Sequence, residues 1–184
     1  MLAHLLHRVQ APVACATTLG FSLGGQVLDL PKSYQGFLTA LRECLEKGGR
    51  YAALEMTSEA LRYGFAKAWP CQVAVLTNLS HDHLQQHGSA EHYLASKAQL
   101  FMHLPAGGLA VLNGCDEVSP LLARVLPADV RAVYYGVSSR GAAIVPLQLV
   151  AKQVEVGWSG RPSSMQFAAR PCGPELRPHE PPRG

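Results

Sequence analysis

The chain has 184 residues, of which 48% are hydrophobic, so it can bury one sizeable core but is too short for two or three full domains. Its formal net charge of +3 is modest and its Lys and Arg residues are scattered, which does not indicate a nucleic-acid partner. Its five cysteines form no C-x-x-C pair, and no apolar run approaches a membrane span, so we expect a cytoplasmic protein with free thiols, no signal peptide and no membrane partner.

The first third of the chain alternates between helical and strand-like patterns. Apolar residues at helical spacing predict a helix over residues 2–9, and a short buried strand follows over residues 12–18. The Gly-rich segment 19–30 predicts a hairpin. An amphipathic helix is expected over residues 37–45, and Gly48 and Gly49 end it.

Three short apolar runs, at residues 51–56, 73–77 and 109–113, each follow a helical or loop segment and each end in polar residues. This alternation predicts an α/β fold, a mainly parallel sheet with helices on both faces. Between the second and third runs, Ser89 is the expected N-cap of a helix that includes Lys97. Glu91 lies in its first turn, where the helix dipole favours an anion.

The last third of the chain carries weaker patterns. A further helix is expected after Val118, a strand near residues 133–135, and a small β extension over residues 144–158. The tail from Arg170 contains five of the thirteen prolines, and we expect it to be disordered. The expected organisation is one domain over residues 1–168 with a Pro-rich tail over residues 169–184.

Polar residues occur where such a sheet would place its ligands, at the carboxyl ends of the strands. Glu55 lies near the end of one apolar run, Asn78 just past the next, and residues 80–83 form the loop that follows. A carboxylate in an apolar strand is costly unless it meets a cation or hydrogen-bond donors, so Glu55 is a candidate ligand of a divalent ion. The alternative is a strand-end glutamate that faces solvent.

The histidines of this loop allow a second interpretation. His81, His83 and His87 have a spacing that can hold zinc, and Asp82 could orient one imidazole or an attacking water, as in a zinc hydrolase. A polar loop with solvated histidines is the other alternative.

The segments around these residues carry a resemblance to one family. They are ATTLG at 16–20, LEMTSE at 54–59, VAVLTNLSHDHL at 73–84, HGS at 87–89 and NGCD at 113–116. Tyr93, Lys97 and Phe101 lie between the last two of these segments. In order and spacing they resemble the central, ATP-binding domain of the Mur ligase family. Within it, the chain is most similar to the ligases that add the third amino acid to UDP-N-acetylmuramoyl dipeptide. The resemblance covers residues 2–118, and weakly 133–167.

This resemblance implies a P-loop-type fold, ATP and Mg²⁺ as cofactors, and a UDP-N-acetylmuramoyl peptide and an amino acid as partners. ATP would phosphorylate the peptide's carboxylate, and the amine would attack the acyl phosphate to form a peptide bond. It implies that Glu55, His83 and carbamylated Lys97 hold the metal and serve catalysis. Without it, Lys97 would be interpreted as an exposed surface residue.

The resemblance also implies binding roles for residues beside this metal site. Asn78 would lie beside the phosphates, and Asn113 and Asp116 would contact the adenosine part of the nucleotide. The residues implied at the muramoyl-peptide substrate are Thr57, Ser58 and His87.

The sequence also departs from the family pattern. The 184 residues contain no G-x-x-G-K-[ST] phosphate loop and no G-x-F-N-x-x-N segment, and we expect the family's C-terminal domain to be missing. Leu30 and Pro31 stand where paired threonines are expected, and Phe65 stands where an arginine is expected. We therefore expect a truncated ligase that is inactive alone. The alternatives are a noncatalytic nucleotide- or partner-binding remnant, a related ligase for another acid, and the zinc hydrolase.

Overall fold

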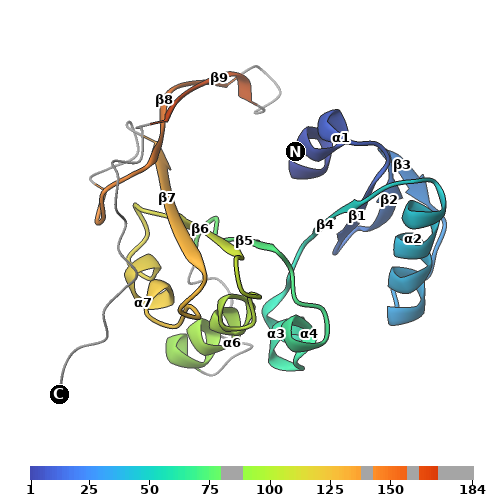
Figure 1. Ribbon diagram of the computed structural model, residues 1–184, viewed down its shortest axis with the longest axis horizontal. Helices are drawn as coiled ribbons and strands as arrows, with labels where there is room; N and C mark the ends of the chain where they lie inside the picture. Colours follow the sequence, from blue (N-terminus) through green and yellow to red (C-terminus); the bar gives the residue numbers. More distant parts are fainter. Residues whose placement is uncertain (80–88, 138–142, 157–161, 170–184) are drawn as a thin grey trace. The chain divides into compact units, whose positions relative to one another are not determined.

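The computed structural model describes residues 1–79, 89–137, 143–156 and 162–169, and at residues 137, 151–156 and 162–169 it describes the backbone alone. The chain divides into two compact units, Met1–Thr57 and Ser58–Gly184 (Figure 1). In the described part of the chain, no helix has both the length and the apolar character needed to cross a membrane.

The first unit is built on a four-stranded sheet with the order β3-β2-β1-β4. Its strands are β1 (Val13–Thr17), β2 (Gly20–Leu23), β3 (Gln26–Leu28) and β4 (Tyr51–Leu54). The first three form an antiparallel meander, and β4 pairs with β1 in parallel. The predicted hairpin and the predicted strands on both sides of it are therefore confirmed.

Two helices cover this sheet. α1 (Leu2–Val9) contacts β1 and β4, and α2 (Tyr34–Glu46) packs on β1 and β2. Figure 1 shows the two helices on opposite sides of the sheet. Both helices were predicted from their apolar spacing, and the positive φ of Gly48 ends α2 as expected.

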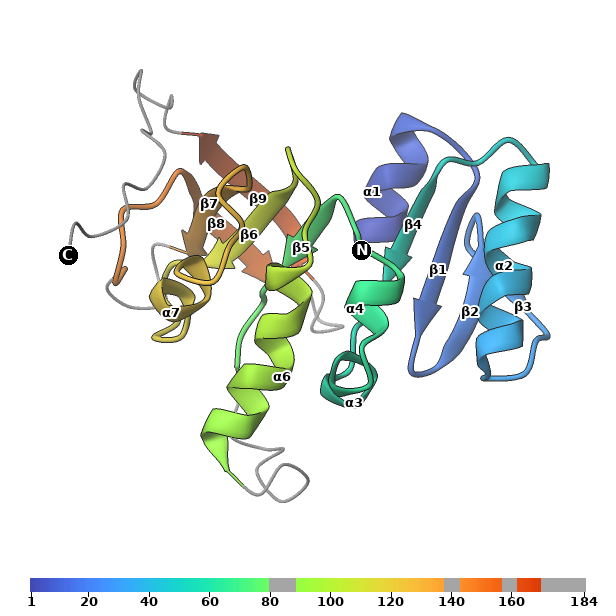
Figure 2. The same cartoon turned by 60° about the horizontal axis from the view of Figure 1, so that its bottom comes forward.

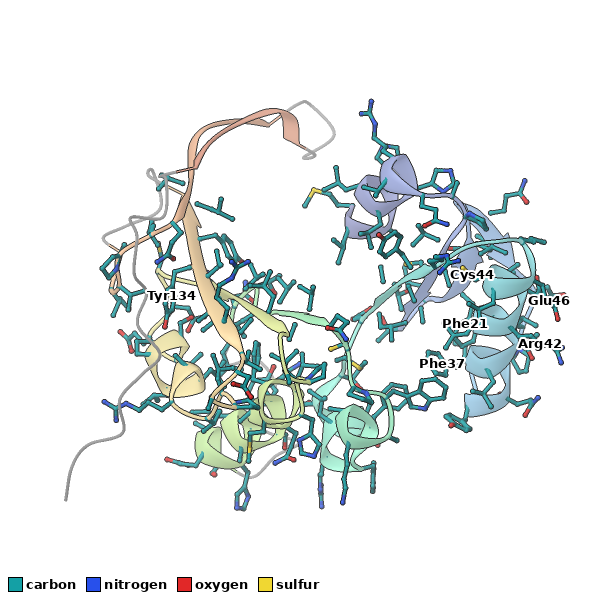
Figure 3. The ribbon with its side chains drawn as sticks, viewed as in Figure 1. Phe21, Phe37, Arg42, Cys44, Glu46 and Tyr134 are labelled. Carbon is teal, nitrogen blue, oxygen red and sulfur yellow. The ribbon has the colours of Figure 1, made fainter. Side chains whose placement is uncertain are left out.

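The core of the first unit lies between α2 and the sheet. Phe21, Phe37 and Cys44 are buried there, together with Ala14 and Leu23. Figure 3 shows Phe21, Phe37 and Cys44 on this side of α2, whereas Arg42 and Glu46 lie on its outer face. Those two charged side chains approach within 3.7 Å and remain exposed, as expected for an i,i+4 pair on a solvated helix face.

Both ends of α2 depend on glycines that lie very close to other backbone groups. Ser33 caps the helix, since its hydroxyl accepts a hydrogen bond of 3.2 Å from the N–H of Gly36. A Cβ on Gly36 would collide with the carbonyl oxygen of Pro31. At the other end, a Cβ on Gly49 would collide with the Pro12 carbonyl and the Cys44 thiol. Each contact is possible because glycine has no side chain.

The second unit contains a five-stranded sheet with the order β5-β6-β7-β8-β9. Its strands are β5 (Val73–Val75), β6 (Leu109–Asn113), β7 (Arg131–Val137), β8 (Leu149–Val156) and β9 (Pro162–Ala169). The first four are parallel, and β9 pairs with β8 in the antiparallel direction. The expected α/β fold with mainly parallel strands is confirmed, and the β8-β9 pair corresponds to the expected β extension.

The helices of the second unit are α3 (Ser58–Arg62), α4 (Phe65–Ala68), α6 (Ala90–Met102) and α7 (Ser119–Ala123). α3 and α4 contact α6, and Figure 2 shows the three side by side. Ser89 caps α6 as predicted, because its hydroxyl accepts a hydrogen bond of 3.2 Å from the N–H of His92. Hydrogen bonds from its own backbone N–H and from Ser89 hold the pKa of Glu91 below its ordinary value.

The core of the second unit is formed where α6 and α7 meet β5 and β6. It contains Phe101 from α6, Leu112 from β6 and Leu122 from α7, all nearly inaccessible to solvent. β6 lies between β5 and β7, and two of its side chains, Ala110 and Leu112, are buried in this core. β6 is therefore the strand at the centre of this hydrophobic core.

Leu112→Ala tests this placement of the core. Leu112 is 0% exposed, so the substitution should lower the free energy of unfolding by about 2–5 kcal/mol through lost burial and the cavity left behind. Leu121→Ala is the matched control, because Leu121 on α7 is 47% exposed and its truncation should cost less than about 0.5 kcal/mol. Urea denaturation measures both. Equal losses in the two variants would contradict the assigned core.

Candidate functional site

In the first unit, Glu55 directly follows β4 and binds the turn between β1 and β2. Its N–H donates to the carbonyl of Ala16 at 2.8 Å, which continues the parallel pairing of β4 with β1. Its Oε2 accepts hydrogen bonds from the N–H of Thr18 at 3.0 Å and from the Thr18 hydroxyl at 3.3 Å. The ammonium of Lys32 donates to the Thr18 carbonyl at 3.1 Å. The sequence required that this carboxylate meet either a cation or hydrogen-bond donors, and in the structure it meets donors.

The carboxylate of Glu55 also has the features of a cation ligand. The side chain is exposed, and Oε1 has no hydrogen-bond partner among the described residues. Carboxylate oxygens of this kind suit magnesium, which prefers oxygen ligands and keeps several waters. Within the described ranges, no three His, Cys, Asp or Glu side chains are grouped to hold a metal ion. The role of Glu55 as a metal ligand remains a prediction.

In the second unit, the carboxyl ends of β5 and β6 are joined by side-chain hydrogen bonds. The Asn113 amide donates to the Thr77 carbonyl at 2.9 Å, and its oxygen accepts from the N–H of Cys115 at 3.0 Å. The Asp116 carboxylate accepts from the N–H of Leu79 at 2.9 Å and from that of Val118 at 3.0 Å. Both residues thus hold the segment that follows β5.

Asn78 lies inside this held segment. Its neighbour Thr77 is bound through its carbonyl and its neighbour Leu79 through its N–H. The Asn78 side chain itself is exposed and has no hydrogen-bond partner among the described residues. The three predicted nucleotide residues, Asn78, Asn113 and Asp116, are therefore brought together at one edge of the sheet.

Two residues that the sequence did not single out complete this edge. The buried hydroxyl of Ser119 donates to the Asn113 carbonyl at 2.5 Å. The hydroxyl of Tyr135, on β7, lies 3.0 Å from the Leu76 carbonyl and 3.3 Å from that of Thr77. Burial raises the pKa of Tyr135, and the nearby Asp116 and Cys115 raise it further. In the sequence, only the position of Tyr135 in a predicted strand pointed to it.

Lys97 lies on α6, on the same side of the helix as Tyr93. Its ammonium is 5.7 Å from the centroid of the Tyr93 ring, within the range of a cation–π contact. Tyr93 is buried and Lys97 is half-buried, so Lys97 is not the fully exposed residue that its sequence context alone suggested. Its carbamylation remains a prediction.

The other predicted site residues lie in two segments, residues 80–88 and residues 57–58. His81, Asp82, His83 and His87 lie in residues 80–88, outside the described ranges, so their roles in magnesium or zinc binding remain predictions. Thr57 ends the first unit and Ser58 begins α3, and both are half-buried.

A family model described as the Mur ligase middle domain matches residues 1–168. The chain belongs to the Mur ligase family. This Mur ligase chain is 38% identical over 144 residues to UDP-N-acetylmuramoyl-L-alanyl-D-glutamate–2,6-diaminopimelate ligase from Thermosynechococcus vestitus, covering 75% of the chain and 28% of the relative. It is 33% identical over 163 residues to the ligase of the same name from Xanthomonas oryzae pv. oryzae, covering 84% of the chain and 31% of the relative.

Solved Mur ligase structures share the fold. A structure of UDP-N-acetylmuramoyl-L-alanyl-D-glutamate–2,6-diaminopimelate ligase aligns with a TM-score of 0.68 at 26% identity, covering 90% of this chain and 33% of that one. The MurF ligase from Thermotoga maritima in complex with ADP aligns with a TM-score of 0.54 at 19% identity, covering 91% of this chain and 34% of that one. The predicted Mur ligase resemblance is confirmed, and this chain spans about a third of these proteins.

Asp116→Asn tests the strand-end network. The amide offers one acceptor oxygen where the carboxylate offers two, so one of the N–H groups of Leu79 and Val118 loses its partner, at a cost of about 1–3 kcal/mol of unfolding free energy. Loss of the negative charge also makes the Tyr135 phenolate easier to form, so the pKa of Tyr135 should fall.

Urea denaturation measures the first effect, and a pH titration of ¹³C-tyrosine NMR signals measures the second. Tyr134 is the internal control, because burial alone raises its pKa and Asp116→Asn should leave it unchanged. A variant with the parent stability and the parent Tyr135 pKa would contradict the network.

Proposed function

We propose that this chain supplies the ATP-binding part of a cytoplasmic ligase that joins an amino acid to a UDP-N-acetylmuramoyl peptide during peptidoglycan precursor synthesis. The relatives' names specify UDP-N-acetylmuramoyl-L-alanyl-D-glutamate and 2,6-diaminopimelate. UDP-N-acetylmuramoyl-L-alanyl-D-glutamate, a nucleotide-linked dipeptide, would be the acid substrate. Because the chain spans 28–31% of these relatives, the complete reaction is proposed for the ligase of which this chain forms a part.

The observation that carries the proposal is the polar cluster at the carboxyl ends of β5, β6 and β7. Parallel α/β sheets bind their ligands at this edge. Asn78 has an exposed side chain there with no hydrogen-bond partner among the described residues, while the backbone on both sides of it is held. An exposed amide can donate to phosphate oxygens, and no hydrogen bond to the described residues would have to break first. The MurF structure with this fold was solved with ADP, which supports the choice of nucleotide.

The proposed chemistry has two steps. An oxygen of the peptide's carboxylate bonds to the γ-phosphorus of ATP while the bond from that phosphorus to the β,γ-bridging oxygen breaks, which releases ADP. The amine nitrogen of the amino acid then bonds to the acyl carbon, phosphate leaves, and the amine loses a proton. Phosphoryl transfer of this kind depends on positioning and charge neutralisation.

The chain's own residues would provide both. We assign Asn78 to the phosphates, Asn113 and Asp116 to the adenosine part, and Thr57, Ser58 and His87 to the muramoyl-peptide. Glu55, His83 and carbamylated Lys97 are assigned to Mg²⁺. When bound, the ion would neutralise charge on the phosphates and the acyl phosphate. The Oε1 of Glu55, which has no hydrogen-bond partner in the described part of the chain, supports its part in this assignment.

His83→Ala tests the magnesium assignment. If the His83 imidazole is a ligand, Mg²⁺ should strengthen ADP binding by the parent chain, and the variant should lose about tenfold or more of that gain. Isothermal titration with ADP, with and without Mg²⁺, measures the difference. His4→Ala is the control, because His4 is an exposed residue of α1, and it should behave as the parent does.

Two results would count against the assignment. Equal magnesium dependence in the His83→Ala and His4→Ala variants would remove His83 from the metal site. Stoichiometric zinc binding that depends on His81, His83 and His87, with no effect of Mg²⁺ on ADP binding, would favour the zinc hydrolase instead.

Carbamylation of Lys97 is tested by ¹³C NMR in ¹³C-bicarbonate. The parent chain should give a carbamate signal that disappears when bicarbonate is removed, since the adduct forms reversibly. Lys97→Arg should lack this signal because a guanidinium does not form the adduct. Lys67→Arg, which changes an exposed lysine of α4, should keep it. A parent spectrum without a carbamate signal at saturating bicarbonate would rule the modification out.

A further inference from the structure

The hydroxyl of Tyr135 crosses over an entire strand to reach its partners. Tyr135 belongs to β7, and its acceptors, the carbonyls of Leu76 and Thr77, directly follow β5. β6 lies between these two strands, and in the register of β6 with β7 the residue opposite Tyr135 is Asn113. Tyr135 and Asn113 therefore converge on the same carbonyl, that of Thr77, from neighbouring strands.

The Leu76 carbonyl needs a donor because the β5 ladder ends beside it and Leu76 is buried, whereas Thr77 is exposed. The N–H of Leu76 still donates to the Val111 carbonyl at 2.8 Å, and the chain then leaves the sheet. The whole Leu76 residue is only 5% exposed, so its backbone also has little access to water. An unsatisfied backbone carbonyl in such surroundings is costly, and the phenol supplies the donor that the sheet no longer provides.

The result is a clamp on both sides of Asn78. Tyr135 and Asn113 hold the carbonyl of Thr77, and Asp116 holds the N–H of Leu79. Asn78 keeps an exposed side chain with no hydrogen-bond partner in the described part of the chain. A residue whose neighbouring backbone is held loses less backbone entropy when a ligand binds, which lowers the cost of binding.

We propose that Tyr135 is a positioning residue that holds the Leu76–Leu79 segment so that Asn78 is presented to the phosphates of a nucleoside diphosphate or triphosphate. This inference rests on the proposed nucleotide site. Tyr135 does not touch the ligand and acts through Asn78. A tyrosine hydroxyl is protonated at neutral pH, and its burial and the nearby Asp116 raise the pKa of Tyr135 further, so it remains a donor into the alkaline range.

Tyr135→Phe removes the hydroxyl and retains the ring. Two measurements on the full chain test the proposal: hydrogen exchange of the Leu79 amide by NMR, and affinity for Mg²⁺–ADP by titration. Loss of one hydrogen bond should speed the exchange and weaken the affinity, each by about fivefold. Tyr134→Phe is the matched control, because the neighbouring hydroxyl has no hydrogen bond among the described residues, and both values should change less than about twofold.

A double-mutant cycle with Asn78→Ala separates positioning from general support of the fold. If Tyr135 acts through Asn78, Tyr135→Phe should change the ADP affinity less than about twofold once Asn78 is replaced. The positioning role would be overturned if the effects of the two substitutions on ADP affinity were additive. It would also be overturned if the rate of Leu79 amide exchange or the ADP affinity were the same in the Tyr135→Phe and Tyr134→Phe variants.

The two measurements also distinguish this inference from the proposed function. If the parent chain binds Mg²⁺–ADP but Tyr135→Phe binds it equally well, the nucleotide site stands and the role of Tyr135 is overturned. If the parent chain does not bind ADP at millimolar concentration, the nucleotide site fails, and the role of Tyr135 in presenting Asn78 fails with it. Faster Leu79 exchange in Tyr135→Phe would then report only a structural hydrogen bond.

Discussion

Parallel pairing of β5, β6 and β7 brings the carboxyl ends of three strands to one edge, and the polar arrangement of the second unit depends on that alignment. Where the strands end, backbone groups lose their ladder partners but remain close to the core. Side chains from β6, β7 and the loop after β6 replace those partners, and the Ser119 hydroxyl binds the Asn113 carbonyl at 2.5 Å. Asn113 and Asp116, which we propose as nucleotide-binding residues, thus also stabilise the edge on which a ligand would bind.

The sequence predicted features that depend on a few neighbouring residues. The Ser89 cap, the end of α2 at Gly48 and the β1-β2-β3 meander follow from local capping and turn chemistry. The strand-end placement of Glu55 and Asn78 followed from the apolar runs before them. The Tyr135 contact could not be predicted, because it requires the strand order and joins residues 59 positions apart. The Thr18–Glu55 contact joins residues 37 positions apart and could not be predicted for the same reason.

The departure from the family pattern at Leu30 and Pro31 has a physical counterpart in the first unit. The Pro31 carbonyl accepts from the N–H of Ser33 at 2.7 Å, and Lys32 reaches the Thr18 carbonyl at the turn that Glu55 also binds. A lysine therefore lies near the proposed metal carboxylate, close to where the family pattern has neutral hydroxyls. Its positive charge alters the electrostatic potential that an acidic substrate would meet there.

The two glycines that enclose α2 limit how the first unit can change over evolutionary time. At Gly36 and Gly49, every other amino acid would push the helix away from the Pro31 carbonyl or from the Pro12 carbonyl and Cys44 thiol. The outer face that carries Arg42 and Glu46 meets no such limit. Sequence drift in this helix should therefore accumulate on its solvent side, while its two anchoring points stay closed to substitution.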